Sequence, residues 1–353
     1  MKQIENSGKN IEYLNTAKGI GIILVVVGHA LPMRLVENYR LLYLLRILIY
    51  AVHMPLFFII SGYLFELKKY NYYEDKIKVF FKKKFIRFII PYLTFSIAIY
   101  MLIYITKYVP KIYKLFYKFG FEVGSINKSI YSILTYEQHI DKHLWFCYVM
   151  FIILILEYAI NRYLSDKRLI ISNIIILYIF YIITSILPFP ELIWKTSKYL
   201  FIFNLGCRIK YIEYFSSSQI GRRISIIISV ISYVLFTFTK YNGLYLANLA
   251  ISPIFEMFSV IVVLIISKKI VETKSNLAFS YLGKKSYVIY LFHQPFIVSG
   301  ITGILSLLFT TKIQIMFIPI VSIIGIIIPL IVDKVIILKS DVCKFLFLGE
   351  KNK

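Results

Sequence analysis

Long apolar runs alternate with short polar connections along nearly the whole chain. Most runs are about 17 to 25 residues long, which is the length that an α-helix needs to cross a bilayer core about 30 Å thick. Ten segments stand out, of which the sixth is short: 17–33, 41–65, 86–107, 144–160, 169–187, 198–209, 224–239, 244–267, 286–309 and 313–337. The pattern predicts an all-α polytopic membrane protein of about ten transmembrane helices, with residues 1–353 forming one membrane-embedded domain.

The polar connections differ in charge between the two sides of the predicted membrane. The connection 66–85 carries seven lysines, whereas alternate connections carry few basic residues, except for the long loop 108–143. Long loops count little in the charge rule. Further basic segments are 161–168, 208–223, 268–285 and the tail from Lys339. Because Lys and Arg accumulate in cytoplasmic loops, both termini are predicted to be cytoplasmic, and the long loop 108–143 is predicted to be extracytoplasmic.

Composition narrows the class of protein further. Hydrophobic residues make up 59% of the 353 residues, and basic cytoplasmic loops that also contact anionic lipid explain the formal net charge of +23. No Lys/Arg face with interleaved aromatic residues lies outside the spans, so nucleic acid is excluded as a partner. The excess of Ile, Lys, Tyr and Phe is typical of an AT-rich bacterial genome. With a first helix that lacks a cleavage site, this predicts a multi-pass protein of the bacterial cytoplasmic membrane.

The first apolar segment, KGIGIILVVVGHA, contains a polar pair. Lys18 and His29 are eleven residues apart, so on a helix they share a face and are separated by roughly 16 Å along the axis. Gly19, Gly21 and Gly28 allow close approach of either a neighbouring helix or a ligand. A lysine alone at this place is typical of a side chain that reaches to the membrane surface. An imidazole far inside a bilayer is costly and usually faces a cavity or a partner.

Three histidines are predicted at middle depths of the membrane. His29 lies roughly 16 Å above the cytoplasmic end of its helix, His53 roughly 18 Å from the outer end of the second, and His293 roughly 10 Å into the ninth. Packing and functional roles suit His53 equally well. For His143, which ends the outer loop, a solvated loop residue and a functional residue are equally favoured, whereas His139 is interpreted as a solvated loop residue. No metal site is predicted, because no pair of histidines with a carboxylate shares a helix face and the three cysteines have no ligand spacing.

Five motifs occur in order at the positions of predicted helices: KGIGIILVVVGHA, HMPLFFIISGYLF, KKKFIRFIIPY, HLWFCYVMF and SYVIYLFHQPF. Together they resemble acyltransferase family 3, the bacterial integral-membrane acyltransferases. They are most similar to its shorter branch, which is related to fucose acetylases and exopolysaccharide-modifying enzymes. The resemblance spans almost the whole chain and implies ten helices that transfer an acyl group to cell-surface glycans.

The resemblance also carries residue assignments. The family has an arginine, ten residues and then an essential histidine in the first helix; here His29 matches and Lys18 replaces the arginine, which keeps the charge but loses the bidentate grip. The family's R-x-x-R before the third helix matches Lys84 and Arg87. Many relatives carry a glutamate five residues after the Trp of the fourth-helix motif, where this chain has Met150.

These assignments predict roles for individual side chains. A histidine suits the general base that activates a hydroxyl, because its pKa is near neutrality, so His29 and His293 are the predicted catalytic residues. The alternative role for His29 is a transient acyl carrier. Lys18, Lys84 and Arg87 are predicted to bind the phosphates of the donor. The predicted substrate pocket has seven further residues: His53, Ser61, Tyr63, Trp145, Tyr148, Glu256 and Tyr290. Arg46 is a further ionisable residue in a span.

The resemblance implies an O-acyltransferase that moves an acyl group, in the first place acetyl, from cytoplasmic acyl-CoA to a hydroxyl of a cell-envelope or exported polysaccharide or its precursor. The expected partners are acyl-CoA, a surface or lipid-linked glycan, the bilayer and the polysaccharide-synthesis machinery, and no permanently bound cofactor is expected. The alternative is an exporter of a glycan or acyl compound. An exporter would more often show repeat symmetry and paired broken helices, neither of which the sequence shows. His293 in a late helix also keeps open the different membrane-bound O-acyltransferase family, and no sequence feature supports a sensor or scaffold.

Overall fold

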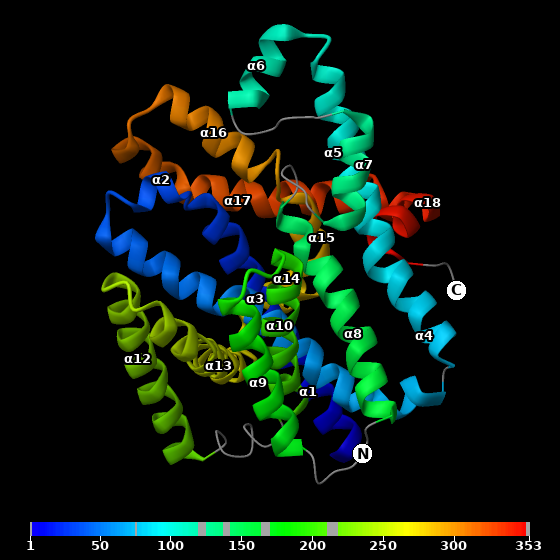
Figure 1. Cartoon of the computed structure of the whole chain (residues 1–353), viewed down its shortest axis with the longest axis vertical. Helices are drawn as coiled ribbons and strands as arrows, with labels where there is room; N and C mark the ends of the chain where they lie inside the picture. Colours follow the sequence, from blue (N-terminus) through cyan, green and yellow to red (C-terminus); the bar gives the residue numbers. More distant parts are fainter. Residues whose placement is uncertain are drawn as a thin grey trace. The chain divides into compact units, whose positions relative to one another are not determined.

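The computed structural model describes residues 2–74, 76–118, 125–136, 142–163, 170–209 and 218–350. These residues form helices and turns and contain no strand, which confirms the predicted all-α class (Figure 1). Contacts divide the chain into two compact units. The first unit comprises Met1–Tyr73 and Ile160–Ser286, and the second comprises Glu74–Ala159 and Tyr287–Lys353. The prediction of one domain over residues 1–353 stays a prediction.

The first unit is built from helices that pair with their neighbours in the chain. Its helices are α1 (Lys2–Ala30), α2 (Met33–Val36), α3 (Arg40–Glu74), α9 (Ile170–Ile186), α10 (Glu191–Cys207), α12 (Gln219–Tyr241), α13 (Tyr245–Ile270) and α14 (Asn276–Lys284). α9 packs against α10, and α12 packs against α13, so each pair forms a helical hairpin (Figure 1). α1 packs against α14 and α13.

Glycines let several of these helices approach to backbone contact. A Cβ atom at Gly62 of α3 would overlap the Phe203 carbonyl of α10, and one at Gly206 of α10 would overlap the Ile59 carbonyl of α3. Gly19 of α1 is in equally close contact with the Phe279 carbonyl of α14. Small residues are common where membrane helices pack closely, since they allow the backbones to touch. At Gly19, the approaching group is therefore a helix and not a ligand.

Replacing Gly62 with alanine is expected to lower the free energy of unfolding by about 1–3 kcal/mol or more, because the blocking atom is backbone and cannot rotate away. Gly300→Ala in α16 (Val298–Leu308) is the matched control, since its Cβ would come no closer than 4.0 Å to the Pro295 carbonyl oxygen. The control is expected to leave stability unchanged or slightly higher. Denaturant titration of both purified variants measures this. Equal losses would contradict the described packing.

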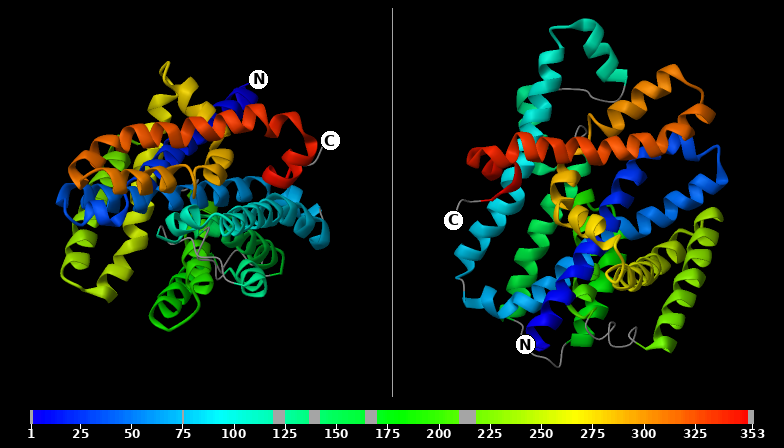
Figure 2. Two further views of the ribbon diagram at one scale, coloured as in Figure 1. Left: turned by 90° about the horizontal axis from the view of Figure 1, so that it is seen from above. Right: turned by 180° about the vertical axis from the view of Figure 1, so that it is seen from behind.

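The second unit contains the remaining helices. They are α4 (Ile77–Lys84), η1 (Phe85–Ile89), α5 (Ile90–Thr106), α6 (Pro110–Lys118), α7 (Ile126–Thr135), η2 (Lys142–Leu144), α8 (Trp145–Tyr163), α15 (Ser286–Phe292), α16 (Val298–Leu308), α17 (Thr311–Val335), η4 (Ile337–Lys339), α18 (Asp341–Cys343) and η5 (Lys344–Leu348). α16 and α17, orange to red, lie side by side in both views of Figure 2. The Phe95 ring of α5 lies 4.6 Å from Phe292 and 5.3 Å from Phe347, centroid to centroid.

Seven helices of the described residues are long and apolar enough to cross a membrane: Glu12–Ala30, Arg40–Lys69, Ile77–Thr106, Lys142–Arg162, Gln219–Tyr241, Tyr245–Ile270 and Thr311–Lys339. Only 22% of the most apolar stretch is buried in the fifth and in the seventh of these spans. Apolar helices exposed to this extent need lipid around them, because soluble proteins rarely expose large apolar patches. The protein is thus a polytopic membrane protein, and the total of about ten spans remains a prediction.

Two predicted segment ends and one predicted helix are wrong. The first helix ends at Ala30 and not at residue 33, since Pro32 disfavours helical geometry in the residue before it. The predicted connection 66–85 is almost entirely helical, because α3 runs to Glu74 and α4 begins at Ile77. The predicted helix 286–309 is broken between α15 and α16 around Pro295, whose ring cannot continue a helix.

The loop predicted at 108–143 contains two short helices, α6 and α7. α7 is held by two tyrosines: the Tyr92 hydroxyl donates to the Ile133 carbonyl at 2.7 Å and the Tyr148 hydroxyl to the Leu134 carbonyl at 3.3 Å. His139 lies outside the described residues. In its described part the segment is therefore structured and attached to α5 and α8.

Candidate active site

The structure brings two of the predicted histidines onto packed helices of the first unit. A Cβ atom at Gly28 would lie 3.0 Å from Ile49 Cγ2 and 3.3 Å from Tyr50 Cε2, so the end of α1 packs on α3. His29 follows directly in the last turn of α1, rather than in the middle of a longer helix. His53 lies one turn along α3 from Ile49 and is buried.

Both imidazoles are held in the same tautomer. His29 Nδ1 lies 2.8 Å from the Val25 carbonyl oxygen, and His53 Nδ1 lies 2.8 Å from the Ile49 carbonyl oxygen. A carbonyl oxygen only accepts, so Nδ1 of each ring carries the proton and donates it. In each neutral ring the lone pair is then on Nε2, which is the nitrogen that can take a proton from a hydroxyl.

Arg46 joins these histidines, and the sequence did not single it out for the site. Its Nε donates to the Leu31 carbonyl at 3.1 Å, and its Nη1 lies 3.1 Å from Met33 Sδ. The guanidinium carbon lies 4.2 Å from the centre of the Tyr50 ring, which packs edge-on to His53 with centroids 4.7 Å apart. The spacing of Arg46, Tyr50 and His53 at four and three residues places them on one helix face, a signal that could have identified the group.

Lys18 lies near the middle of α1 and is partly exposed. Among the described residues no carboxylate pairs with Lys18 or with Lys68 of α3, so neither charge is compensated there. Ser61 and Tyr63 flank Gly62 at the α3–α10 contact. Tyr63 is buried there and Ser61 partly exposed, which suits close helix packing.

Glu256 is buried in α13 and pairs with a lysine that sequence reasoning missed. Lys198 Nζ of α10 lies 2.6 Å from Glu256 Oε1, and the Ser252 hydroxyl donates to the same oxygen at 2.9 Å. Within the described residues Glu256 Oε2 accepts no hydrogen bond. The pair neutralises both charges in the interior of the first unit.

In the second unit, Arg87 lies in η1 against the C-terminal segment. Its Nη1 donates to the Leu348 carbonyl at 2.8 Å and to Glu350 Oε1 at 3.1 Å, and its guanidinium carbon lies 4.7 Å from the Tyr287 ring centre. Gly349, with φ of +62°, packs on the backbone of Ile86 and Arg87. The Nε and Nη2 groups of Arg87 have no partner among the described residues, so three N–H donors remain.

Other predicted residues of the second unit make aromatic contacts. Lys84 ends α4, and its Nζ lies 5.1 Å from the centre of the Phe80 ring. Trp145 begins α8 and packs edge-on to Phe146 with centroids 6.4 Å apart. The bond from Tyr148 to α7 gives that residue a structural role. Of the predicted donor-binding residues, Lys84 and Arg87 belong to one unit and Lys18 belongs to the other.

His293 lies at the end of α15 beside a second histidine. Its ring centroid is 5.8 Å from that of His143, and the Tyr290 hydroxyl donates to the His143 carbonyl. His293 Nδ1 is 2.7 Å from the Tyr290 carbonyl oxygen, which gives it the same tautomer as His29. His143 is buried rather than solvated. No group of three or more metal-ligating side chains occurs in the part of the chain that the structure describes.

A family model matches most of the chain. The family model described as "Acyltransferase domain" matches residues 11–334. The chain belongs to this family, acyltransferase family 3. No curated protein and no solved structure matches the chain. All the predicted site residues of this acyltransferase lie within the matched part, whereas Leu348 and Glu350, which hold Arg87, lie beyond it.

Proposed function

We propose that this membrane acyltransferase moves an acetyl group from cytoplasmic acyl-CoA to a hydroxyl of a cell-envelope or exported polysaccharide or its precursor. The observation that carries the proposal is the tautomer of His29, whose Nδ1 is held by the Val25 carbonyl at 2.8 Å so that Nε2 is the base. The chain belongs to a family of acyltransferases, and the Arg46 guanidinium donates to the Leu31 carbonyl, two residues after His29. Ester formation from a thioester needs a base such as this imidazole and a cation such as this guanidinium.

The proposed chemistry is a direct transfer. The acceptor hydroxyl oxygen attacks the carbonyl carbon of the thioester while His29 Nε2 takes the hydroxyl proton. The guanidinium of Arg46 stabilises the oxyanion, since its Nη2 group has no partner among the described residues. The C–S bond then breaks, and the CoA sulfur leaves with the proton from His29. An ester and a free thiol result, and the imidazole returns to its neutral form.

The basic residues are assigned to the donor. In the first unit, Lys18 and Lys68 have no carboxylate partner among the described residues; in the second unit, Arg87 separately retains three N–H donors. Phosphate oxygens take such charge-assisted bonds readily. From Lys18 the pantetheine arm would follow the face of α1 for roughly 16 Å to reach His29. In the second unit, His293 and its neighbour His143 supply the second candidate imidazole.

Release of CoA thiol from acetyl-CoA by the purified protein tests the proposal. Thiol release is expected to accelerate when an envelope polysaccharide is added, because the acceptor hydroxyl is the second substrate. Movement of the polysaccharide into liposomes without any thiol release would instead support an exporter.

Replacing Lys18 is expected to change donor binding more than turnover. Lys18→Ala should raise the KM for acetyl-CoA by about 10- to 100-fold, because hydrogen bonds to charged groups contribute about 1.5–3 kcal/mol. Lys18→Arg restores the residue that the family carries at this position and should lower KM below that of the wild type, since the guanidinium binds phosphate through two bonds. Steady-state kinetics with varied acetyl-CoA measure both. An unchanged KM in Lys18→Ala would contradict phosphate binding by this residue.

A further inference from the structure

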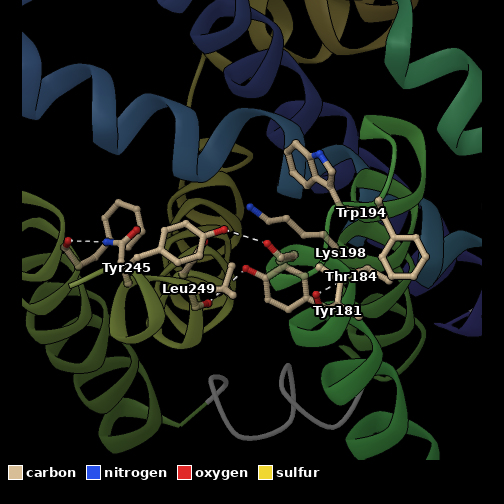
Figure 3. Close-up of a pocket in the computed structure, with 12 residues that line it drawn as sticks. Tyr181, Thr184, Trp194, Lys198, Tyr245 and Leu249 are labelled. Carbon is tan, nitrogen blue, oxygen red and sulfur yellow. Dashed lines mark hydrogen bonds between the residues drawn. The ribbon is translucent and has the colours of Figure 1, made fainter. Parts of the chain in front are cut away.

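A pocket of about 490 Å³ opens between four helices of the first unit (Figure 3). Neither His29 nor His53 lines it. Such a volume falls within the range of about 300–1,000 Å³ of small-molecule sites. Figure 3 shows Tyr181 and Thr184 of α9, Trp194 and Lys198 of α10, and Tyr245 of α13 around it. The other lining residues are Ser185, Leu187, Phe189, Phe236, Asn248, Leu249 and Ser252.

The floor of the pocket is polar but electrically neutral. Tyr181 and Thr184 are buried at 2% and 1% exposure. Lys198 is the single cation among the lining residues, and its charge is balanced by Glu256 at 2.6 Å. A phosphate-rich donor such as acyl-CoA is a poor match for this floor, because no uncompensated positive charge lines it. A neutral polar ligand is a good match.

The rim of the pocket is aromatic and open. Phe189 and Tyr245 are exposed at 42% and 61%, and Trp194 is partly exposed. Aromatic faces carry negative charge density and attract the weakly positive C–H groups on the flat side of a sugar ring. By the predicted topology these ends of α9, α10, α12 and α13 face the outside of the cell, where exported glycans are found.

Several polar groups of the pocket keep donors or acceptors that no described residue uses. The Ser185 hydroxyl is buried without a hydrogen bond, and Lys198 Nζ uses one of its three N–H donors for Glu256. Asn248 donates its Nδ2 to the Phe236 carbonyl at 2.9 Å, which leaves its Oδ1 as an acceptor. Donors and acceptors thus remain for the hydroxyl groups of a ligand.

The pocket is joined to the helix that carries His53. Tyr199, next to Lys198, stacks on Phe58 of α3 with centroids 4.3 Å apart. Phe255, next to Glu256, packs with Ile47 and Ala51 of α3. Tyr199 and Phe255 therefore connect the pocket to α3, the helix that carries His53.

We propose that this pocket binds one neutral sugar unit of the acceptor, with a sugar face on Trp194 and its hydroxyl groups on Lys198, Ser185 and Asn248. Its description as an acceptor subsite rests on the proposed function; its binding of a sugar does not. This inference assigns the glycan to a site distinct from the donor residues. The pocket then holds the sugar while a neighbouring hydroxyl reacts.

The chain contains two tryptophans, which makes Trp194 a direct reporter. In Trp145→Phe, titration with methyl glycosides of glucose, galactose, mannose and rhamnose is expected to give a saturable change in tryptophan fluorescence with at least one of them. Trp194→Phe, which retains Trp145, is the matched control and should give none. Absence of a saturable change with all four glycosides would overturn the proposal, and so would an equal response in both variants. A response to phosphatidylglycerol vesicles alone would also overturn it, since the pocket would then hold lipid.

Kinetics separate this inference from the proposed function. Trp194→Ala should raise the KM for the polysaccharide acceptor by about 3- to 10-fold, the loss expected for one aromatic contact, with the KM for acetyl-CoA unchanged. A rise in the KM for acetyl-CoA alone would contradict the acceptor role. If the wild type transfers no acyl group, the proposed function fails, while the fluorescence titration still decides whether the pocket binds a sugar.

Discussion

Replacing His29 with glutamine is expected to reduce the kcat of acyl transfer by about 100- to 10,000-fold, the range for loss of a general base. Glutamine preserves much of the side-chain volume and can still donate to the Val25 carbonyl, but it cannot take a proton from the acceptor hydroxyl. The rate of ester formation under saturating acetyl-CoA and acceptor is the quantity to measure. The KM for acetyl-CoA is expected to change little, because the donor phosphates are assigned to other residues.

His53→Gln is the matched control for this experiment. His53 has the same bond from Nδ1 to a carbonyl four residues earlier, at the same 2.8 Å, and packs against Tyr50. We expect His53 to position His29 and Arg46, so its replacement should reduce kcat by less than about 10-fold, below the range for a general base. If His29→Gln retains wild-type turnover while His53→Gln loses it, the roles of the two residues are reversed. Retention by both would remove this cluster from the mechanism.

Removing Glu256 is expected to have the largest effect on stability. Glu256→Ala leaves the Lys198 ammonium without its partner at a site where the two side chains are only 15% and 7% exposed. Breaking a buried pair in this way costs about 3–5 kcal/mol, because the remaining charge is desolvated and unpaired. The free energy of unfolding from denaturant titration in detergent measures the loss. The double variant Lys198→Met/Glu256→Met should recover most of it, since neither charge then remains.

A second ion pair, on α10 with Lys198, provides the control. Lys195 and Glu191 are also 2.6 Å apart, but Glu191 is 58% exposed. Glu191→Ala should therefore lower the free energy of unfolding by less than about 1 kcal/mol. If Glu256→Ala costs no more than Glu191→Ala, or the double variant is less stable than the single, Glu256 and Lys198 do not stabilise the first unit as a buried pair.

Periodicity and hydropathy predicted the all-α class and the membrane location, because a bilayer demands long apolar helices. They failed where helices continue beyond the apolar core. Residues 66–74 and 77–85 are too polar to be told from a loop, yet α3 and α4 include most of them. The break before α16 was visible as Pro295 in the sequence, but other prolines, such as Pro55 and Pro319, lie within intact helices. Hydropathy alone cannot separate these cases.

Candidate site residues could be proposed from the sequence where they lie together in one motif. His29 and Lys18 lie in one segment, and the family motifs placed Arg87 and His293. The partners of these residues come from distant parts of the chain. Glu256 pairs with a lysine 58 residues away, and His143 lies beside a residue in α15. Such contacts depend on which helix faces meet, and a single sequence without homologues does not specify this.

The most direct test of the central claim is the fate of a labelled acetyl group. Purified wild-type protein in liposomes is supplied with acetyl-labelled acetyl-CoA and an envelope polysaccharide, and ester-bound label on the polysaccharide and free CoA thiol are measured together. We expect label in an alkali-labile ester and one thiol released for each ester formed. Contradiction would come from polysaccharide that crosses the liposome membrane unlabelled, with acetyl-CoA left intact.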